Sequence, residues 1–288
     1  MARLTVAGSQ PAQLSVPVAR LGEGPVWDAA SAALYWVDIP AGLVHRLDED
    51  GTHVSWDAGQ PVGAAVPRAS GGLVLAARDG FLALDTGTGA VTSLVPVEAD
   101  RPETRMNDGS CDRSGRFWAG TMAVDESPGA GSLYRLDPDL RVTRVLDGVG
   151  ISNGIGWNPD ETLMYYVDSL AHQVDVMDYD PVTGETGRRR RLVALGEGGV
   201  VPDGLTVDAE GCIWVAVWGG GAVQRYRPDG RLKQIIELPA ARVTSCAFGG
   251  RDLDVLYIST AAGPGALAGA MFACRPGVTG LPSHPFRG

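Results

Sequence analysis

Four short motifs place an acidic or amide side chain at nearly the same distance ahead of an apolar strand. They are LGEGPVW with Glu23, RMNDGSC with Asn107, ISNGIGW with Asn153 and VPDGLTV with Asp203. Each of these residues lies 10 or 11 positions before the first apolar residue of the strand. A glycine follows Glu23, Asn153 and Asp203, and we expect it to let the backbone turn sharply. Carboxylate and amide oxygens are the ligands that hard divalent cations prefer, so the motifs suggest metal chemistry.

The strands that follow these motifs recur along the whole chain. Six segments share one plan, in which a turn with Asp or Gly precedes a short apolar strand, a second strand and a polar turn. Their first apolar residues, spaced 39 to 49 positions apart, are Leu34, Leu73, Phe117, Met164, Ile213 and Leu256. A period of about 40–50 residues with several strands per unit is typical of propeller blades.

The sequence therefore predicts an all-β fold, a six-bladed β-propeller. We expect one domain over residues 1–288. A strand from residues 1–20 would close the ring against the last blade, and residues 281–288 would form a mobile C-terminal tail.

Equivalent positions in a propeller lie in a ring, because the innermost strand of every blade lines the central channel. The carboxylates of Glu23 and Asp203 and the amide oxygen of Asn153 would converge there and repel one another without a cation between them. Three protein ligands leave coordination positions for water and substrate, as in catalytic metal sites. The two remaining blades offer no such oxygen ligand and hold Val62 or Gly63 and Ser245 or Cys246. The competing interpretation is that each polar residue caps its own turn.

Several stretches taken together resemble the SMP-30/gluconolactonase/regucalcin family over nearly the full length of the chain. They are GEGPVWD…LYWVDIPAG, RMNDGSCDRSGRFWAGTM, ISNGIGWNPD…YYVDSL, VPDGLTVDAEGCIWVAVWGGG and CAFGG. The resemblance implies a six-bladed propeller with one divalent metal ion that hydrolyses sugar lactones, such as aldonolactones, to aldonic acids. The WGGG run is more similar to the bacterial sugar lactonases than to the animal members.

The same resemblance implies roles for individual residues. Glu23, Asn153 and Asp203 match the family's metal ligands, and Asp203 would also be the catalytic acid/base. Arg105 and Asn107 match its substrate-binding pair. Asp125 follows the GTM motif at a position where animal members commonly carry Glu. The side chain of aspartate is shorter than that of glutamate, so it would reach less far toward the substrate.

Three functions fit these residues. The first is metal-dependent lactone hydrolysis with one divalent ion, which could be Ca²⁺, Zn²⁺, Mg²⁺, Mn²⁺ or Fe²⁺. The second is another metal-dependent esterase or phosphotriesterase-like hydrolase, which would share the ring but differ in pocket lining. The third is a calcium-binding regulator without catalysis, which would need a closed site with more protein oxygens.

Composition narrows the choice of partners and of chemistry. The formal net charge of −10 and the sequence pI of about 4.8 disfavour nucleic acid and anionic membrane surfaces. There is no C-x-x-C pair. The N-terminus lacks the apolar core of a signal peptide. Besides the small-molecule sugar lactone that the resemblance implies as substrate, we expect no nucleic-acid or membrane partner, a monomer and a cytoplasmic location.

Overall fold

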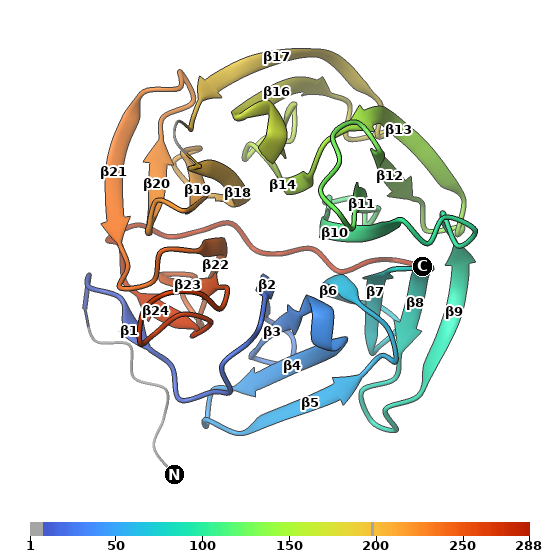
Figure 1. The fold of residues 1–288 in the computed structure, drawn as a ribbon, viewed down its shortest axis with the longest axis horizontal. Helices are drawn as coiled ribbons and strands as arrows, with labels where there is room; N and C mark the ends of the chain where they lie inside the picture. The colour runs from blue at the N-terminus through green and yellow to red at the C-terminus, as the bar shows by residue number, and fades with distance from the viewer. Residues whose placement is uncertain (1–7, 197–198) are drawn as a thin grey trace.

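The computed structural model describes residues 8–196 and 199–288, which form a ring of six four-stranded antiparallel sheets (Figure 1). The predicted six-bladed β-propeller is confirmed. In each blade the first strand lies nearest the axis of the ring and the fourth lies at the rim. Over the same residues, no helix is long and apolar enough to cross a bilayer.

The strands of the six blades follow one another in chain order. Blades 1 and 2 consist of β2 (Gly22–Asp28), β3 (Ala33–Asp38), β4 (Leu43–Asp48), β5 (His53–Asp57), β6 (Val62–Pro67), β7 (Leu73–Ala77), β8 (Gly80–Leu84) and β9 (Val91–Pro96). Blades 3 and 4 consist of β10 (Thr104–Cys111), β11 (Phe117–Ala123), β12 (Gly131–Leu136), β13 (Val142–Val149), β14 (Ser152–Trp157), β15 (Leu163–Asp168), β16 (Gln173–Tyr179) and β17 (Thr186–Ala194). Blade 5 consists of β18 (Val201–Val207), β19 (Ile213–Trp218), β20 (Ala222–Tyr226) and β21 (Leu232–Glu237). Short 3₁₀ turns follow two of the second strands, η1 (Ile39–Ala41) and η2 (Ser169–Ala171).

Blade 6 is built from both ends of the chain. Its inner strands are β22 (Val243–Gly249), β23 (Val255–Thr260) and β24 (Phe272–Cys274). The outer strand is β1 (Ala12–Gln13), which pairs antiparallel with β24. A segment that precedes the first repeat therefore completes the last blade, so that unfolding either end opens the ring.

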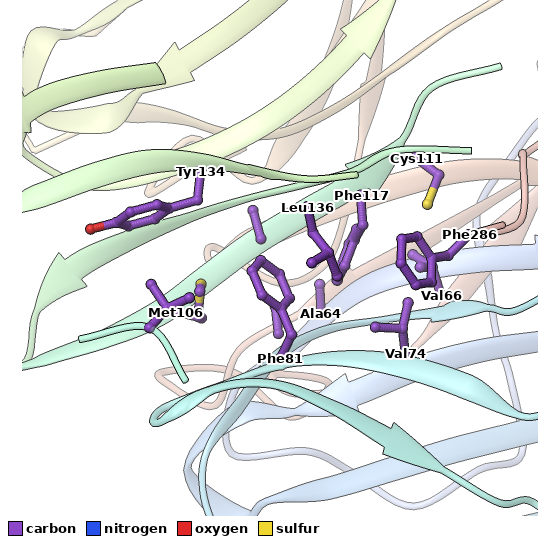
Figure 2. Close-up of a cluster of buried hydrophobic side chains, with 13 residues drawn as sticks. Ala64, Val66, Val74, Phe81, Met106, Cys111, Phe117, Tyr134, Leu136 and Phe286 are labelled. Atoms are coloured by element: carbon purple, nitrogen blue, oxygen red, sulfur yellow. The ribbon is translucent and has the colours of Figure 1, made fainter. Parts of the chain in front are cut away.

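The hydrophobic core lies between the blades. Among the described residues, buried apolar side chains form six clusters, and neighbouring blades share each cluster. Figure 2 shows the cluster between blades 2 and 3, where the rings of Phe81 and Phe117 meet edge to face with centroids 5.6 Å apart. Because each blade packs against two neighbours, the ring holds its inner strands at fixed distances.

Buried aspartates fix the turns that leave two of the inner strands. The carboxylate of Asp112, after β10, accepts the indole N–H of Trp118 at 3.0 Å. Asp208, after β18, accepts the indole N–H of Trp214 at 2.8 Å. Both aspartates are fully buried, and each also accepts backbone N–H groups of its own turn. The turns between the first and second strands of blades 3 and 5 are thereby anchored to the core.

The C-terminal segment crosses the ring and is anchored to several blades (Figure 1). Phe286 is completely buried in the cluster between blades 2 and 3 and exchanges backbone hydrogen bonds with Pro67 and Ala69 at 2.8 and 2.7 Å. Farther back along the segment, the Ser283 hydroxyl donates to the carbonyl of Trp27. The expectation of a mobile tail is wrong, because a single aromatic residue near the end reaches the core. We call residues 279–288 the strap.

Replacing Phe286 by alanine should destabilise the whole protein, although the residue lies third from the C-terminus. Removing a fully buried phenylalanine costs about 3–5 kcal/mol. Urea unfolding followed by circular dichroism should show a clearly lower midpoint for Phe286→Ala. Val182→Ala, at an 81% exposed position, is the control and should unfold like the wild type. Equal midpoints for all three proteins would mean that the strap adds nothing to stability.

Candidate metal centre

A register irregularity occurs on the innermost strand of every blade that the structure describes. The pairing shifts between Glu23 and Val26, Val62 and Ala64, Met106 and Asp108, Ser152 and Ile155, Pro202 and Leu205, and Val243 and Ser245. A β-bulge bends its strand and redirects a side chain. The four motif residues therefore lie in or beside equivalent bulges, and blades 2 and 6 place Gly63 and Thr244 at this position.

The glycines that follow the motif residues act in two different ways. Gly24 has a left-handed backbone with φ of 53°, as expected for a sharp turn. Gly154 and Gly204 do not, and the expectation is wrong for them. A Cβ on Gly154 would lie 2.6 Å from the backbone nitrogen of Leu205, and one on Gly204 would collide with Ser245. These two glycines allow neighbouring inner strands to approach each other closely at the axis.

A chain of hydrogen bonds orients the amide side chains of the ring. The Nη1 of Arg105 donates to Oδ1 of Asn107 at 2.8 Å, and Nδ2 of Asn107 donates to Oδ1 of Asn153 at 3.0 Å. The Nδ2 of Asn153 donates to Oγ of Ser169 at 2.8 Å, and that hydroxyl donates to the carbonyl of Pro202 at 2.7 Å. Because Nδ2 of Asn153 donates its hydrogen bond to Ser169, Oδ1 of Asn153 is the atom that faces Asn107 and the interior of the ring.

Aspartates at the ends of second strands hold the beginnings of two inner strands. Asp38, at the end of β3, accepts the backbone N–H groups of Arg20 and Leu21 at 2.8 and 3.1 Å. Asp168, at the end of β15, accepts those of Gly150 and Ile151, both at 3.0 Å. The strands that carry Glu23 and Asn153 are thus fixed in the same manner.

Glu23 and Asp203 are both buried, and neither forms an ion pair with a residue that the structure describes. Glu23 is 3% exposed and Asp203 is 5% exposed. Oε2 of Glu23 accepts the N–H of Gly24 at 3.1 Å, whereas Oδ1 of Asp203 is buried and has no hydrogen-bond partner among the described residues. Such an unpaired buried oxygen is costly unless something absent from the polypeptide satisfies it.

Burial and mutual repulsion act on these acids together. Burial raises the pKa of Glu23 well above its usual range, and the negative charges of Asp203 and Asp108 raise it further. Burial followed by the charge of Asp108 likewise raises the pKa of Asp203. Burial raises the pKa of Asp108 itself to about 7, although its carboxylate accepts the N–H of Gly109 at 2.7 Å. Three buried acids therefore share a region with too little positive charge.

This donor set fits a divalent cation. Glu23 and Asp203 supply carboxylate oxygens, and Asn153 supplies an amide oxygen whose orientation is already fixed. Within residues 8–196 and 199–288, no three His, Cys, Asp or Glu side chains are grouped to hold a metal, so the amide is needed as the third ligand. Oxygen-only ligands favour Ca²⁺, Mg²⁺ or Mn²⁺ over Zn²⁺. The metal role of the three residues stays a prediction, but the structure does bring them together.

Of the three predicted substrate residues, Arg105 and Asn107 are hydrogen-bonded to each other, whereas Asp125 lies on a surface turn. Arg105 and Asn107 are hydrogen-bonded to each other beside Asn153. Asp125 is exposed and accepts the backbone N–H of Ser127 at 3.0 Å, which makes it the cap of a surface turn. Burial lowers the pKa of Arg105, and the charges of Glu23 and Glu126 oppose that effect. The acid of this loop that acts on Arg105 is thus Glu126.

Three further residues of the site were missed in the sequence. Ser169 orients an amide, Asp108 adds a buried charge, and Glu126 acts on the arginine. Asp108 directly follows Asn107, and Ser169 directly follows the YYVD strand end, so proximity to a motif was the available signal. Their roles depend on bulges and turns that a repeat pattern does not reveal.

Comparison with known proteins gives consistent matches over almost the whole chain. Residues 21–262 match the family model described as SMP-30/Gluconolactonase/LRE-like region. The regucalcin of Bos taurus is 40% identical over 285 residues, which cover 93% of this chain and 95% of that protein. A crystal structure described as a calcium-binding protein, regucalcin, from Agrobacterium tumefaciens has a TM-score of 0.92 at 31% identity, with 98% of each chain covered. A luciferin-regenerating enzyme has a TM-score of 0.90 at 29% identity, with 97% of this chain and 100% of that chain covered.

Amide variants of the ring acids should be more stable than the wild type when no metal is present. Glu23→Gln and Asp203→Asn keep the shape of each side chain but remove a buried, unpaired charge. In excess chelator, each variant should melt a few degrees higher than the wild type in differential scanning calorimetry.

Adding Ca²⁺ should reverse the order of the melting temperatures, so that the wild type melts above both amide variants. A ligand at about 100 times its Kd stabilises the folded state by about 2.7 kcal/mol, and the wild type should gain this while the variants gain little. Glu185→Gln, at an exposed position in blade 4, is the matched control and should follow the wild type in both buffers. A chelated wild type that melts above both amide variants would show that the acids are satisfied without a cation.

Proposed function

The chain belongs to the SMP-30/gluconolactonase/LRE-like family, and from this membership and the geometry of the ring we propose that it is a metal-dependent lactonase. The proposed reaction opens a sugar lactone, of the aldonolactone type, to the corresponding aldonic acid. One divalent ion would be bound at the axis of the propeller. Calcium is the ion we propose, because the ligands are all oxygens and a relative of the same fold is described as calcium-binding.

One observation carries this proposal. Two buried carboxylates and an oriented amide oxygen lie together. Asn107 donates to that amide oxygen, and Arg105 in turn donates to Asn107. A site with only three protein ligands leaves room for substrate and water. A purely structural calcium site would be expected to use more protein oxygens.

Glu23, Asn153 and Asp203 would hold the ion, whose contribution when bound is to polarise the ester carbonyl and lower the pKa of water. Arg105 and Asn107 would bond the hydroxyl groups of the sugar and set its orientation. Arg105 would also offset the negative charge that develops on the carbonyl oxygen.

Asp203 is the proposed acid/base of the reaction. It would accept a proton from the attacking water as the water oxygen bonds to the carbonyl carbon. When the carbon–oxygen bond of the lactone ring breaks, the same proton passes from Asp203 to the departing oxygen, which becomes the free hydroxyl of the aldonic acid. The carboxyl group ends in its starting state, so no further reactant is needed.

The alternatives differ from this proposal in what they need from Asp203. A non-catalytic calcium-binding regulator would use the same three ligands but would turn nothing over. Another esterase or a phosphotriesterase-like hydrolase would keep the acid and accept a different carbonyl or phosphoryl group. The guanidinium donors of Arg105 and the amide oxygen of Asn107 suit a polyhydroxylated substrate, which favours the sugar lactone.

The test is acid release from a panel of aldonolactones in a weakly buffered pH indicator. The protein should be assayed as purified, after chelation, and after addition of Ca²⁺, Mg²⁺, Mn²⁺, Zn²⁺ or Fe²⁺ one at a time. We expect hydrolysis above the spontaneous rate that vanishes with chelator and returns with calcium. Asp203→Asn should lose at least about 100-fold in kcat, as general acid–base residues typically do, and Glu185→Gln should match the wild type. If no lactone is hydrolysed with any metal while calcium still binds, the regulator replaces the lactonase.

Two neighbouring acids of one loop should differ in their effect on substrate binding. Glu126→Gln removes the charge that acts on Arg105 and should raise KM for the best lactone by up to about fivefold, the usual limit for an exposed charge. Asp125→Asn keeps the turn cap to Ser127 and should leave KM within about twofold. Steady-state kinetics on both variants measures the two KM values. A larger increase in KM for Asp125→Asn than for Glu126→Gln would support Asp125 as the substrate contact.

A further inference from the structure

Glu98 is a buried acid in the connection between blades 2 and 3. We call residues 97–103, which join β9 to β10, the connector; it directly precedes the strand that carries Arg105 and Asn107. The side chain of Glu98 is only 5% exposed, although a carboxylate is costly to bury. Its φ of 51° lies in the left-handed region, which glutamate rarely adopts. Such a conformation persists only where the surroundings impose it.

Both carboxylate oxygens of Glu98 accept hydrogen bonds, and the donors come from three strands of blade 3. Oε2 accepts the hydroxyl of Thr104, the first residue of β10, at 2.6 Å. Oε1 accepts the hydroxyls of Thr121 on β11 and Tyr134 on β12, at 3.3 and 2.8 Å. Tyr134 lies at the edge of its apolar cluster with the hydroxyl directed away from it (Figure 2). Burial, together with the hydrogen bond to Glu98, raises the pKa of this phenol, which therefore stays protonated and donates.

Arg101 extends this network to the loop between β11 and β12. Its Nη1 lies 3.3 Å from Oε1 of Glu98, and its Nη2 donates to the carbonyl of Ala130 at 3.2 Å. The connector also holds the other end of the loop, since the N–H of Val124 donates to the carbonyl of Glu103 at 2.8 Å. The loop is therefore fastened at both ends to the segment that Glu98 anchors.

The strand and the loop that this network joins both act on the substrate side of the proposed site. Arg105 directly follows Thr104 and donates to Asn107 at 2.8 Å. Burial lowers the pKa of Arg105, and the charge of Glu126, in the loop, is one of two that oppose this effect. A displaced connector would therefore move the guanidinium and Glu126 relative to each other.

We propose that Glu98 is a positioning residue for substrate binding, which acts by holding β10 and the loop in a fixed relation. The inference rests on the proposed lactonase function, because that function assigns Arg105 to the substrate. Glu98 itself would touch neither the metal ion nor the lactone, since three hydroxyls and Arg101 surround its oxygens. Its loss should therefore weaken substrate binding more than proton transfer, and KM should change more than kcat.

The first test compares Glu98→Ala with Glu98→Gln in steady-state kinetics on the best aldonolactone at saturating calcium. Alanine removes every acceptor, so KM should rise at least about tenfold while kcat stays within about threefold. Glutamine keeps an oxygen that can accept from Tyr134 and Thr121. Its NH₂ can donate to the hydroxyl of Thr104, which can in turn donate to the carbonyl of Arg101 at 3.2 Å. Only a partly exposed ion pair is lost, and KM should stay within about threefold of the wild type.

Tyr179→Phe is the control for lost stability alone. The Tyr179 hydroxyl donates to Asp112 at 2.6 Å, just beyond the other end of β10, so the variant also removes a buried hydrogen bond to a carboxylate. It should lower the midpoint of urea unfolding and leave KM unchanged. An equal rise of KM in Tyr179→Phe, or a folded Glu98→Ala with the wild-type KM, would overturn the positioning role.

Hydrogen exchange measured by NMR tests the same network without turnover of any substrate. Arg101→Ala removes the link to Ala130 at a side chain that is 37% exposed, so the fold should survive. The backbone amide of Val124 should then exchange at least about tenfold faster, because the loop opens more often. The amide of Gly42, which donates to the carbonyl of Ile39 at 3.1 Å in the equivalent turn of blade 1, should exchange as in the wild type.

These readings separate failure of the inference from failure of the lactonase. Unchanged exchange at Val124 would overturn the network itself, and this measurement needs no folded variant at position 98. Faster exchange at Val124, in a protein whose wild type hydrolyses no lactone, would overturn the lactonase and with it the role of Glu98 in substrate binding. Faster exchange together with the KM increase in Glu98→Ala and its rescue in Glu98→Gln would establish the positioning role.

Discussion

The structure depends on one unfavourable interaction, the burial of Glu23 and Asp203 near each other and near Asp108. Removing a carboxylate from water without a partner costs several kcal/mol, and like charges add to that cost. The polypeptide offers Arg105 as a nearby cation, and Oδ1 of Asp203 remains unpaired among the described residues. In the proposed site a divalent ion between the acids would remove the repulsion and supply the missing partner, so the same feature that weakens the metal-free fold would create affinity for the metal.

A propeller can support this arrangement because its stability comes from elsewhere. The apolar clusters between blades lie away from the axis, and closure by β1 and the strap joins both ends of the chain to the ring. The scaffold then fixes the positions of the side chains around the axis through features that recur from blade to blade. Bulges redirect the side chains, Gly154 and Gly204 let inner strands approach, and Asp38 and Asp168 hold the beginnings of β2 and β14. Each blade contributes one such position, and in the proposed site only some blades would use it for a metal ligand.

Much of this could be predicted from the sequence, because propeller blades repeat and the repeat aligns equivalent residues. The period places Glu23, Asn107, Asn153 and Asp203 at matching positions in their repeats. What escaped prediction depends on backbone geometry within a repeat. The bulges leave no compositional trace, and the reason for two of the glycines is contact with the next blade. The anchoring of the tail depends on one aromatic residue, Phe286, meeting a cluster whose other buried members lie between residues 64 and 136. The loop after GTM shows the same limit, since the sequence gives no sign that the charge of Glu126 acts on Arg105.

The measurement that tests the central claim most directly is a crystal structure of the protein soaked with Mn²⁺, with anomalous differences collected to locate the ion. The account predicts one strong peak on the axis of the ring, at about 2.0–2.6 Å from oxygens of Glu23, Asn153 and Asp203, with open positions filled by water. A peak at another place, or a hydrogen bond from the protein to Oδ1 of Asp203 in place of a metal, would contradict it.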